Sequence, residues 1–252
     1  MVSMKTFIGI LGRDHLDSLR VMGTVAVAYH LNGQWKEAEE LQLVVMKALR
    51  QKLGTEDVET LDSMSNLAGT LHSQGRWDAA VALRVEEVDI SKRWLGADHP
   101  DTVERMEDLV KLYLSQGRLE AAESLGMEVM ETRKRVLGTT HPRTLDIMSN
   151  LAAIMRTRGQ WGAAQRLGGE VLEIHKQLVR ERQSPSLHLG INLAHVLRTL
   201  GRDTDAILAM EQILEPWESH SEFDPDHPIY VEFREKLDRW KEEQLKQGEL
   251  EK

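Results

Sequence analysis

The stretch SNLAGTLHSQGRWDAA, residues 65–80, contains the end of one amphipathic helix, a glycine and the beginning of a second helix. Before the glycine, apolar residues recur three and four positions apart, which places them on one helix face. These residues are Leu61, Met64, Leu67, Ala68 and Leu71. Gly75 supplies the conformational freedom that a helix end needs, and the helical spacing resumes after Trp77. The stretch therefore predicts two helices joined by a tight turn.

The same unit recurs along the chain with a period of 42 residues. The period is carried by the turn glycines Gly33, Gly75, Gly117, Gly159 and Gly201 and by the alanines Ala38, Ala80, Ala122, Ala164 and Ala206. Leu-Gly pairs close the units at Leu53-Gly54, Leu95-Gly96 and Leu137-Gly138. A fixed period of 20 to 50 residues is typical of stacked supersecondary units. The sequence thus predicts an all-α, right-handed α-solenoid of about five helix-turn-helix repeats.

Within each repeat, residue size indicates which positions face a neighbouring helix. The recurring alanines are small enough for helix A and helix B to approach closely. We expect Trp35, Trp77 and Trp161 to fill the volume beside them, as core residues rather than a ligand cage. Pro100 and Pro142 stand where the next helix A begins, a position at which a missing amide hydrogen costs nothing.

The pattern LGADHPDT followed by NLAGTLHSQGRWDAA resembles the 42-residue tetratricopeptide repeat of the kinesin-light-chain type, which many fungal and bacterial proteins share. The resemblance covers residues 2–218. The matching positions in one unit are Leu67, Ala68, Leu71, Gly75, Trp77 and Ala80. It implies a helical repeat array that binds other proteins rather than an enzyme.

The two ends depart from the repeat. Residues 1–12 align on the end of a helix B whose helix A is missing, so we expect a partial first unit there and an array over residues 1–218. Residues 219–252 are expected to form a loop and a charge-rich helix that caps the array, because a solenoid needs a polar outer face at its end. A membrane-surface helix is the alternative for this segment.

Composition excludes several classes of protein. The chain has 252 residues, no Cys and a formal net charge of −9. Disulfides and thiolate metal sites are therefore excluded. The negative charge argues against nucleic-acid binding, which depends on Lys and Arg. No apolar run suits a signal peptide or a membrane span, so we expect a cytoplasmic protein without a membrane partner.

The residue before the Leu-Ala pair is the candidate for function. Stacked helix pairs form a concave groove lined mainly by helix A, suited to a peptide. Asn66, Asn150 and Asn192 recur there, although Asn is a mediocre helix former. In peptide-binding tetratricopeptide proteins this Asn often holds the ligand backbone, and the resemblance implies the same role here. The alternative is that the amides link adjacent helices through their two-sided hydrogen bonding.

The predicted groove also carries charges of both signs. The full candidate set is Asn66, Asp108, Lys111, Asn150, Arg156, Asn192, His195 and Arg198. Carboxylates stand near the start of helix A at Asp62, Glu104 and Asp146. The basic members suit an acidic peptide, although a solvated helix face gives the same pattern. They do not reproduce the Lys and Asn set with which co-chaperone clamps grip a terminal carboxylate.

Catalytic and metal motifs are missing from the sequence. It contains no GxSxG, HExxH or phosphate-binding glycine loop, so we expect no enzyme and no cofactor. His99 and His141 recur before Pro, which indicates a structural role at the helix start. His188 and His195 lie seven residues apart without a third ligand, so no metal site is predicted.

The sequence therefore favours a non-catalytic scaffold or adaptor that binds a peptide segment of a partner in the concave groove. The alternative is a sensor or regulatory repeat region derived from a larger NTPase-type signalling receptor. The incomplete N-terminal repeat would also suit a homodimer in which a second copy covers it.

Overall fold

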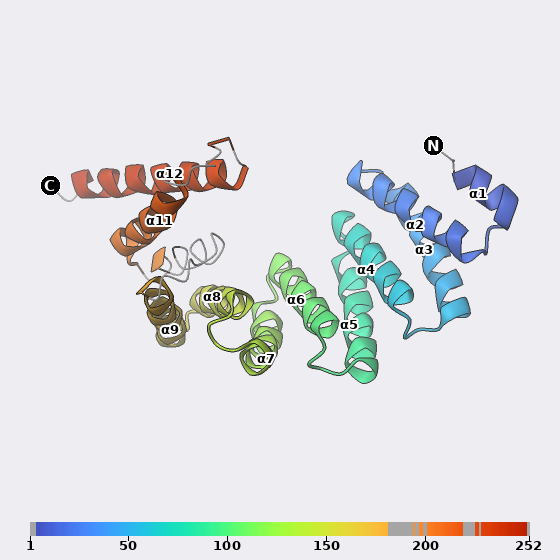
Figure 1. The fold of residues 1–252 in the computed structure, drawn as a ribbon, viewed down its shortest axis with the longest axis horizontal. Helices are drawn as coiled ribbons and strands as arrows, with labels where there is room; N and C mark the ends of the chain where they lie inside the picture. The colour runs from blue at the N-terminus through green and yellow to red at the C-terminus, as the bar shows by residue number, and fades with distance from the viewer. Residues whose placement is uncertain are drawn as a thin grey trace. The chain divides into compact units, whose positions relative to one another are not determined.

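The computed structural model describes residues 4–180, 194, 197–198, 201–218, 225–226 and 228–250, and the elements within these ranges are helices (Figure 1). They are α1 (Met4–Leu11), α2 (Leu16–Leu31), α3 (Trp35–Leu53), α4 (Val58–Ser73), α5 (Trp77–Trp94), α6 (Pro100–Ser115), α7 (Leu119–Leu137), α8 (Pro142–Thr157), α9 (Trp161–Arg180), α11 (Asp203–Glu218) and α12 (Pro228–Leu250). In repeat terms α2, α4, α6 and α8 are A helices, whereas α1, α3, α5, α7, α9 and α11 are B helices.

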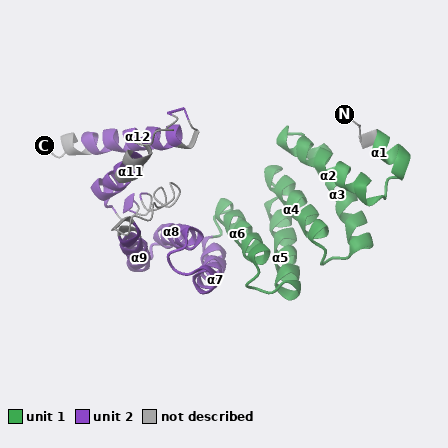
Figure 2. Cartoon of the chain, viewed as in Figure 1, with its two compact units in different colours: residues 1–118 green, residues 119–252 purple. Residues whose placement is uncertain are grey.

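The chain forms two compact units, residues 1–118 and 119–252 (Figure 2). In unit 1, each helix from α1 to α6 packs against the next one along the chain, and α2 also contacts α4. In unit 2, α7 packs on α8, α8 on α9, and α11 on α12. Each unit is thus a stack of antiparallel helix pairs, and the fold class is the predicted all-α solenoid. None of the described helices is long and apolar enough to cross a membrane.

The structure confirms the predicted turns at the recurring glycines and the predicted starts of helix A at the His-Pro pairs. Every recurring turn glycine has a positive φ, for example 76° at Gly75, a conformation that other residues rarely adopt. His99 and His141 are the N-cap residues of α6 and α8, and each imidazole Nδ1 accepts the amide hydrogen two residues on at 3.2 Å. The recurring His-Pro pair therefore starts helix A, as expected.

The recurring small and aliphatic residues are buried as predicted, but the recurring tryptophans are not. The recurring alanines are all buried, and so are Leu61, Met64, Leu67, Ala68 and Leu71. In contrast, Trp35, Trp77 and Trp161 are 40%, 51% and 63% exposed, so the prediction that they fill the core was wrong. Each is the first residue of a B helix, directly after the turn.

Helix α12 has the start of an A helix and a different outer face. It begins after Asp226-His227 at Pro228, like α6 and α8. Phe233 and Leu237 are buried, as are the equivalent residues of α8. Arg234 and Asp238 are exposed, although their equivalents in α8 are fully buried apolar residues. This polar face is the composition expected of a terminal element, while the division at residue 218 stays a prediction.

Candidate functional site

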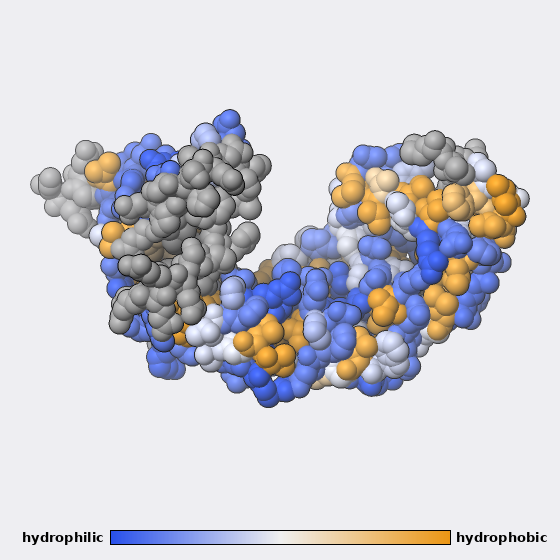
Figure 3. Space-filling model, viewed as in Figure 1, coloured by the Kyte–Doolittle hydropathy of each residue, from blue (hydrophilic) through white to orange (hydrophobic). Residues whose placement is uncertain are grey.

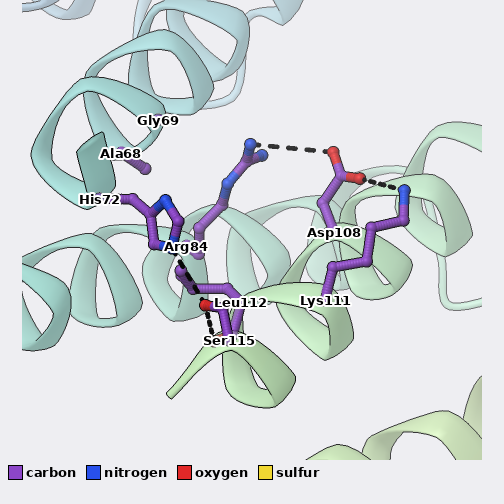
Figure 4. Close-up of a pocket in the computed structure, with 8 residues that line it drawn as sticks. All are labelled: Ala68, Gly69, His72, Arg84, Asp108, Lys111, Leu112 and Ser115. Atoms are coloured by element: carbon purple, nitrogen blue, oxygen red, sulfur yellow. Dashed lines mark hydrogen bonds and ion pairs between the residues drawn. The ribbon is translucent and has the colours of Figure 1, made fainter.

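Two pockets lie side by side between the A helices α4 and α6 of unit 1, and we call them together the furrow. The first, named here the basic pocket, has a volume of about 270 Å³ and is lined by Ala68, Gly69, His72, Arg84, Lys111 and Leu112, with Asp108 and Ser115 at its sides (Figure 4). The second, the acidic pocket, measures about 340 Å³ and is lined by Asp62, Ser65, Asp101, Glu104, Arg105 and Asp108, with Val58. Asp108 lines both pockets, so they are neighbours in the furrow.

The basic pocket is built on small and apolar residues of α4 and α6 with charged groups above them. Gly69 has no atom within 4 Å of the place where a Cβ would stand, so its missing side chain keeps the pocket open. The Lys111 Nζ lies 3.0 Å from Asp108 Oδ1, and the Arg84 guanidinium lies 3.8 Å from Asp108 Oδ2 (Figure 4). On the opposite side His72 Nε2 lies 3.0 Å from Ser115 Oγ. Two cations therefore share one carboxylate at this rim.

A buried carboxylate fixes the floor of the furrow. Glu87 of α5 is 0% exposed and accepts hydrogen bonds from Arg84 at 3.1 Å, Arg105 at 2.5 Å and Ser65 at 2.5 Å. Arg105 also donates to Asp62 at 2.9 Å. Such charge-assisted hydrogen bonds hold both guanidinium groups in place. We call these five residues the Glu87 network.

The electrostatics of Arg105 follow from this network. Burial opposes its charge, but hydrogen bonds to Asp62 and Glu87 and the charges of both carboxylates outweigh burial, so the pKa of Arg105 is raised above its usual value. Its Nε is nevertheless buried without a hydrogen-bond partner among the described residues. Arg105 thus remains a fixed cation in the wall of the acidic pocket.

The acidic pocket has more carboxylates than cations. Asp62, Asp101, Glu104 and Asp108 line it together with Arg105, whose charge Glu87 already balances. Glu104 is exposed, and no described residue lies within ion-pair distance of it. This end of the furrow therefore has negative charge available to a ligand.

Two members of the Glu87 network, Glu87 and Arg105, occupy positions that are apolar or small in the other repeats. Glu87 stands where Val45, Val129 and Val171 stand in other B helices, and all three valines are buried. Arg105 stands where α8 has the buried Ile147. Sequence reasoning missed Arg84, Glu87 and Arg105. The signal that would have found Glu87 and Arg105 is a charged residue at a repeat position that is otherwise apolar or small, whereas Arg84 stands where α3 has the buried, polar Gln42.

The structure brings two of the residues predicted from the sequence together in the furrow, while the other described candidates lie outside it. Asp108 and Lys111 meet in the furrow. Asn66 of α4 and Asn150 of α8 are exposed, and neither side chain has a hydrogen-bond partner in the described part of the chain. Within that part, the amides therefore do not link adjacent helices. Asn192 and His195 lie outside the described residues.

The two predicted arginines of unit 2 are engaged differently. Arg198 forms ion pairs with Glu243 at 2.7 Å and Asp203 at 3.4 Å and stacks on the Trp240 ring at 4.7 Å, so it binds α12. Arg156 of α8 is half-buried, and its Nε has no partner among the described residues. A role for either in binding an acidic peptide stays a prediction, and for Arg198 it would require release of α12.

The N-terminal helix leaves apolar surface uncovered in unit 1. Ile10 of α1 is 75% exposed and Leu31 at the end of α2 is 78% exposed. Apolar side chains gather over α1 and α2 on the face shown in Figure 3. Homodimer formation through α1 stays a prediction. Across the described residues, no three His, Asp or Glu side chains are placed to hold a metal ion.

Comparison with known proteins assigns the repeats. A model of the tetratricopeptide repeat family matches residues 57–134 and 112–177, and a second model of that family matches residues 18–59. A crystal structure of a putative kinesin light chain from Podosopora anserina, with nearly identical TPR-like repeats, is 25% identical, with a TM-score of 0.65 over 80% of this chain and 95% of that chain. BtubC (BKLC) from P. vanneervenii is 19% identical, with a TM-score of 0.62 over 88% of each chain, a likeness of fold. No curated protein matches the sequence.

Proposed function

Because the chain belongs to the tetratricopeptide repeat family, we propose that it is a non-catalytic scaffold that binds a peptide segment of a partner protein along its A helices. The family's fold is a protein-interaction fold, and the described helices form stacks of the repeat that such proteins use. The finer assignment, binding along the A helices, rests on the residues that these helices leave open.

The proposal rests on two exposed asparagine side chains, whose amides are open to a ligand. Asn66 and Asn150 are exposed on A helices and lack side-chain partners within the described residues. An amide both donates and accepts, so it can pair with the amide and carbonyl groups of an extended peptide, whatever its side chains. Asn66 lies on α4, which forms one wall of the furrow. Asn66 would hold a peptide backbone while the furrow contacts its side chains, and Asn150 would hold peptide backbone on α8.

The experiment compares a groove variant with a matched control. Peptides selected for binding to the full chain from a displayed peptide library are titrated against Asn66→Ala/Asn150→Ala. We expect a loss of affinity of at least about tenfold, because the two substitutions together remove at least two hydrogen bonds of about 1 kcal/mol each.

The control is Gln51→Ala/Gln165→Ala, which removes two exposed amides from the B helices α3 and α9. It should leave the affinity unchanged. Equal affinity of the groove variant and the original protein, with both folded by circular dichroism, would refute binding through the asparagines.

A further inference from the structure

The furrow carries opposite charges at its two ends, and both ends depend on Asp108. Toward the start of α6 it presents Asp101 and Glu104, and toward the end of α6 it presents Lys111, with Arg84 beneath. Glu104 and Lys111 are seven residues apart on one helix, which corresponds to about 10 Å along its axis. The furrow is therefore a short surface with a negative half and a positive half.

Asp108 stands between the halves and is already paired. Its two oxygens face Lys111 at 3.0 Å and Arg84 at 3.8 Å. A ligand carboxylate near Lys111 would take over the role of Asp108 there. Asp108 would then be free to pair with a cation placed beside Glu104. One internal ion pair would be replaced by two intermolecular pairs, and no charge of the furrow would lose its partner.

A ligand with charge of one sign fits less well. A purely acidic segment would meet Asp62, Asp101, Glu104 and Asp108 at the other half, and like charges at close range are repulsive. A purely basic segment would draw Asp108 away from Lys111 without replacing it. The Glu87 network keeps Arg84 and Arg105 in place in both cases, so the floor does not adapt to the ligand.

We propose that the furrow between α4 and α6 selects a partner segment that carries both a basic and an acidic side chain about three residues apart, with the basic group at Glu104 and the acidic group at Lys111. The spacing follows from the axial distance of about 10 Å and a rise of about 3.1 Å per residue in a polyproline II segment, whose three residues per turn place side chains three positions apart on the same face. This inference rests on the proposed function and adds the chemistry of the partner to it.

The test is a double-mutant cycle on the full chain with defined peptides. The probe is the capped peptide Gly-Ser-Arg-Ser-Ser-Glu-Ser-Gly, with versions in which Arg, Glu or both are replaced by Gln. Binding is followed by backbone amide shifts in nuclear magnetic resonance. We expect the doubly charged probe to bind at least about fivefold more tightly than either singly charged version.

The protein variants assign each charge to its pocket. Glu104→Gln should weaken only the peptides that contain Arg, and Lys111→Gln only those that contain Glu, each by about threefold to fivefold. Glu40→Gln and Lys47→Gln are the matched controls on α3, because both side chains are exposed and no described residue pairs with them. These controls should leave all four affinities unchanged.

The results separate this inference from the proposed function. Equal affinities for the four peptides, with amide shifts at Asn66 and Gly69, would overturn the charge selection and leave peptide binding along α4 intact. Equal weakening of every peptide by both protein variants would also overturn it. If none of the peptides shifts any amide of α4 or α6, the charge selection and the use of this furrow both fail.

Discussion

The α5–α6 junction of unit 1 and the α7–α8 junction of unit 2 occupy the same place in successive repeats and have opposite chemistry. The first buries Glu87 against Arg105. The second has Val129 and Ile147 at these positions, both buried. The backbone register of 42 residues is the same in both. The repeat thus fixes where helices meet, while the residues at the contact can be polar or apolar if every buried charge is paired.

The position of Arg84 adds a second difference. Its equivalent in α7 is Gly126, where a Cβ would lie 2.9 Å from Leu151 Cδ2. The α7–α8 junction therefore packs tightly at Gly126, whereas at the α5–α6 junction the Arg84 side chain reaches the furrow. The polar α5–α6 junction holds charged side chains at a pocket. The apolar α7–α8 junction shows how the equivalent helices pack when no charge is buried between them.

Of the substitutions that test the difference between the two junctions, removal of Glu87 should change the free energy of unfolding most. Glu87→Val restores the residue of the other repeats but leaves Arg84 and Arg105 without their shared carboxylate. We expect the free energy of unfolding to fall by about 3 to 5 kcal/mol. Urea unfolding followed by circular dichroism measures this. The double variant Glu87→Val/Arg105→Ile converts the junction to the apolar kind and should recover most of the loss. A double variant no more stable than the single one would show that charge pairing does not govern this junction.

Two glycine-to-alanine substitutions should have smaller effects on stability, and these should differ because the room around the two glycines differs. Gly69→Ala adds a methyl group in open space within a helix, so it should stabilise the protein by about 0.5 to 1 kcal/mol. Gly126→Ala makes the same change beside the buried Leu151, and crowding should cancel the gain. Urea midpoints measure both. Equal stabilisation by the two substitutions would contradict the tight closure of the α7–α8 junction.

The smallest effect concerns an exposed ion pair, which calibrates the buried one. Arg20 pairs with Glu59 at 2.6 Å between α2 and α4, and its hydrogen bonds lower the pKa of Glu59 against the smaller effect of burial. A lowered pKa means that the pair stabilises the fold above the ordinary pKa of Glu, and that this contribution disappears as the pH falls through the lowered value.

Glu59→Gln should therefore cost less than about 1 kcal/mol at neutral pH, and the two proteins should converge in acid and at high salt. Urea midpoints across pH and salt test this. A cost similar to that of Glu87→Val would remove the distinction between the exposed and the buried pair.

The sequence predicted the fold well because the period itself carries the information. Helix bounds, turn glycines and His-Pro starts all follow from residues that recur at one spacing. The tryptophans were misjudged for a related reason, since recurrence shows that a position is equivalent but does not show whether it faces the core. Trp77 recurs with Trp35 and Trp161, yet all three are exposed at the start of a helix.

The furrow was only half predictable. Asp108 and Lys111 lie three residues apart on one helix, so their proximity follows from local spacing. Glu87 and Arg105 come from different helices, and their partner Ser65 lies 40 residues before Arg105. Their meeting depends on how α4, α5 and α6 pack. Periodicity alone identifies such residues as departures from the repeat pattern and does not show that they contact each other.

The Glu87 network also bears on how the chain finds its order as it folds. The repeats in the described part of the chain offer each helix several similar apolar surfaces, and multidomain and repeat chains are prone to pairing the wrong neighbours. If α6 docked on a B helix other than α5, Arg105 would be buried against Val45 or Val129, and its charge would have no partner. A buried charge without a partner costs several kcal/mol. The polar junction therefore marks one neighbour as the correct one in a chain whose other surfaces are almost interchangeable.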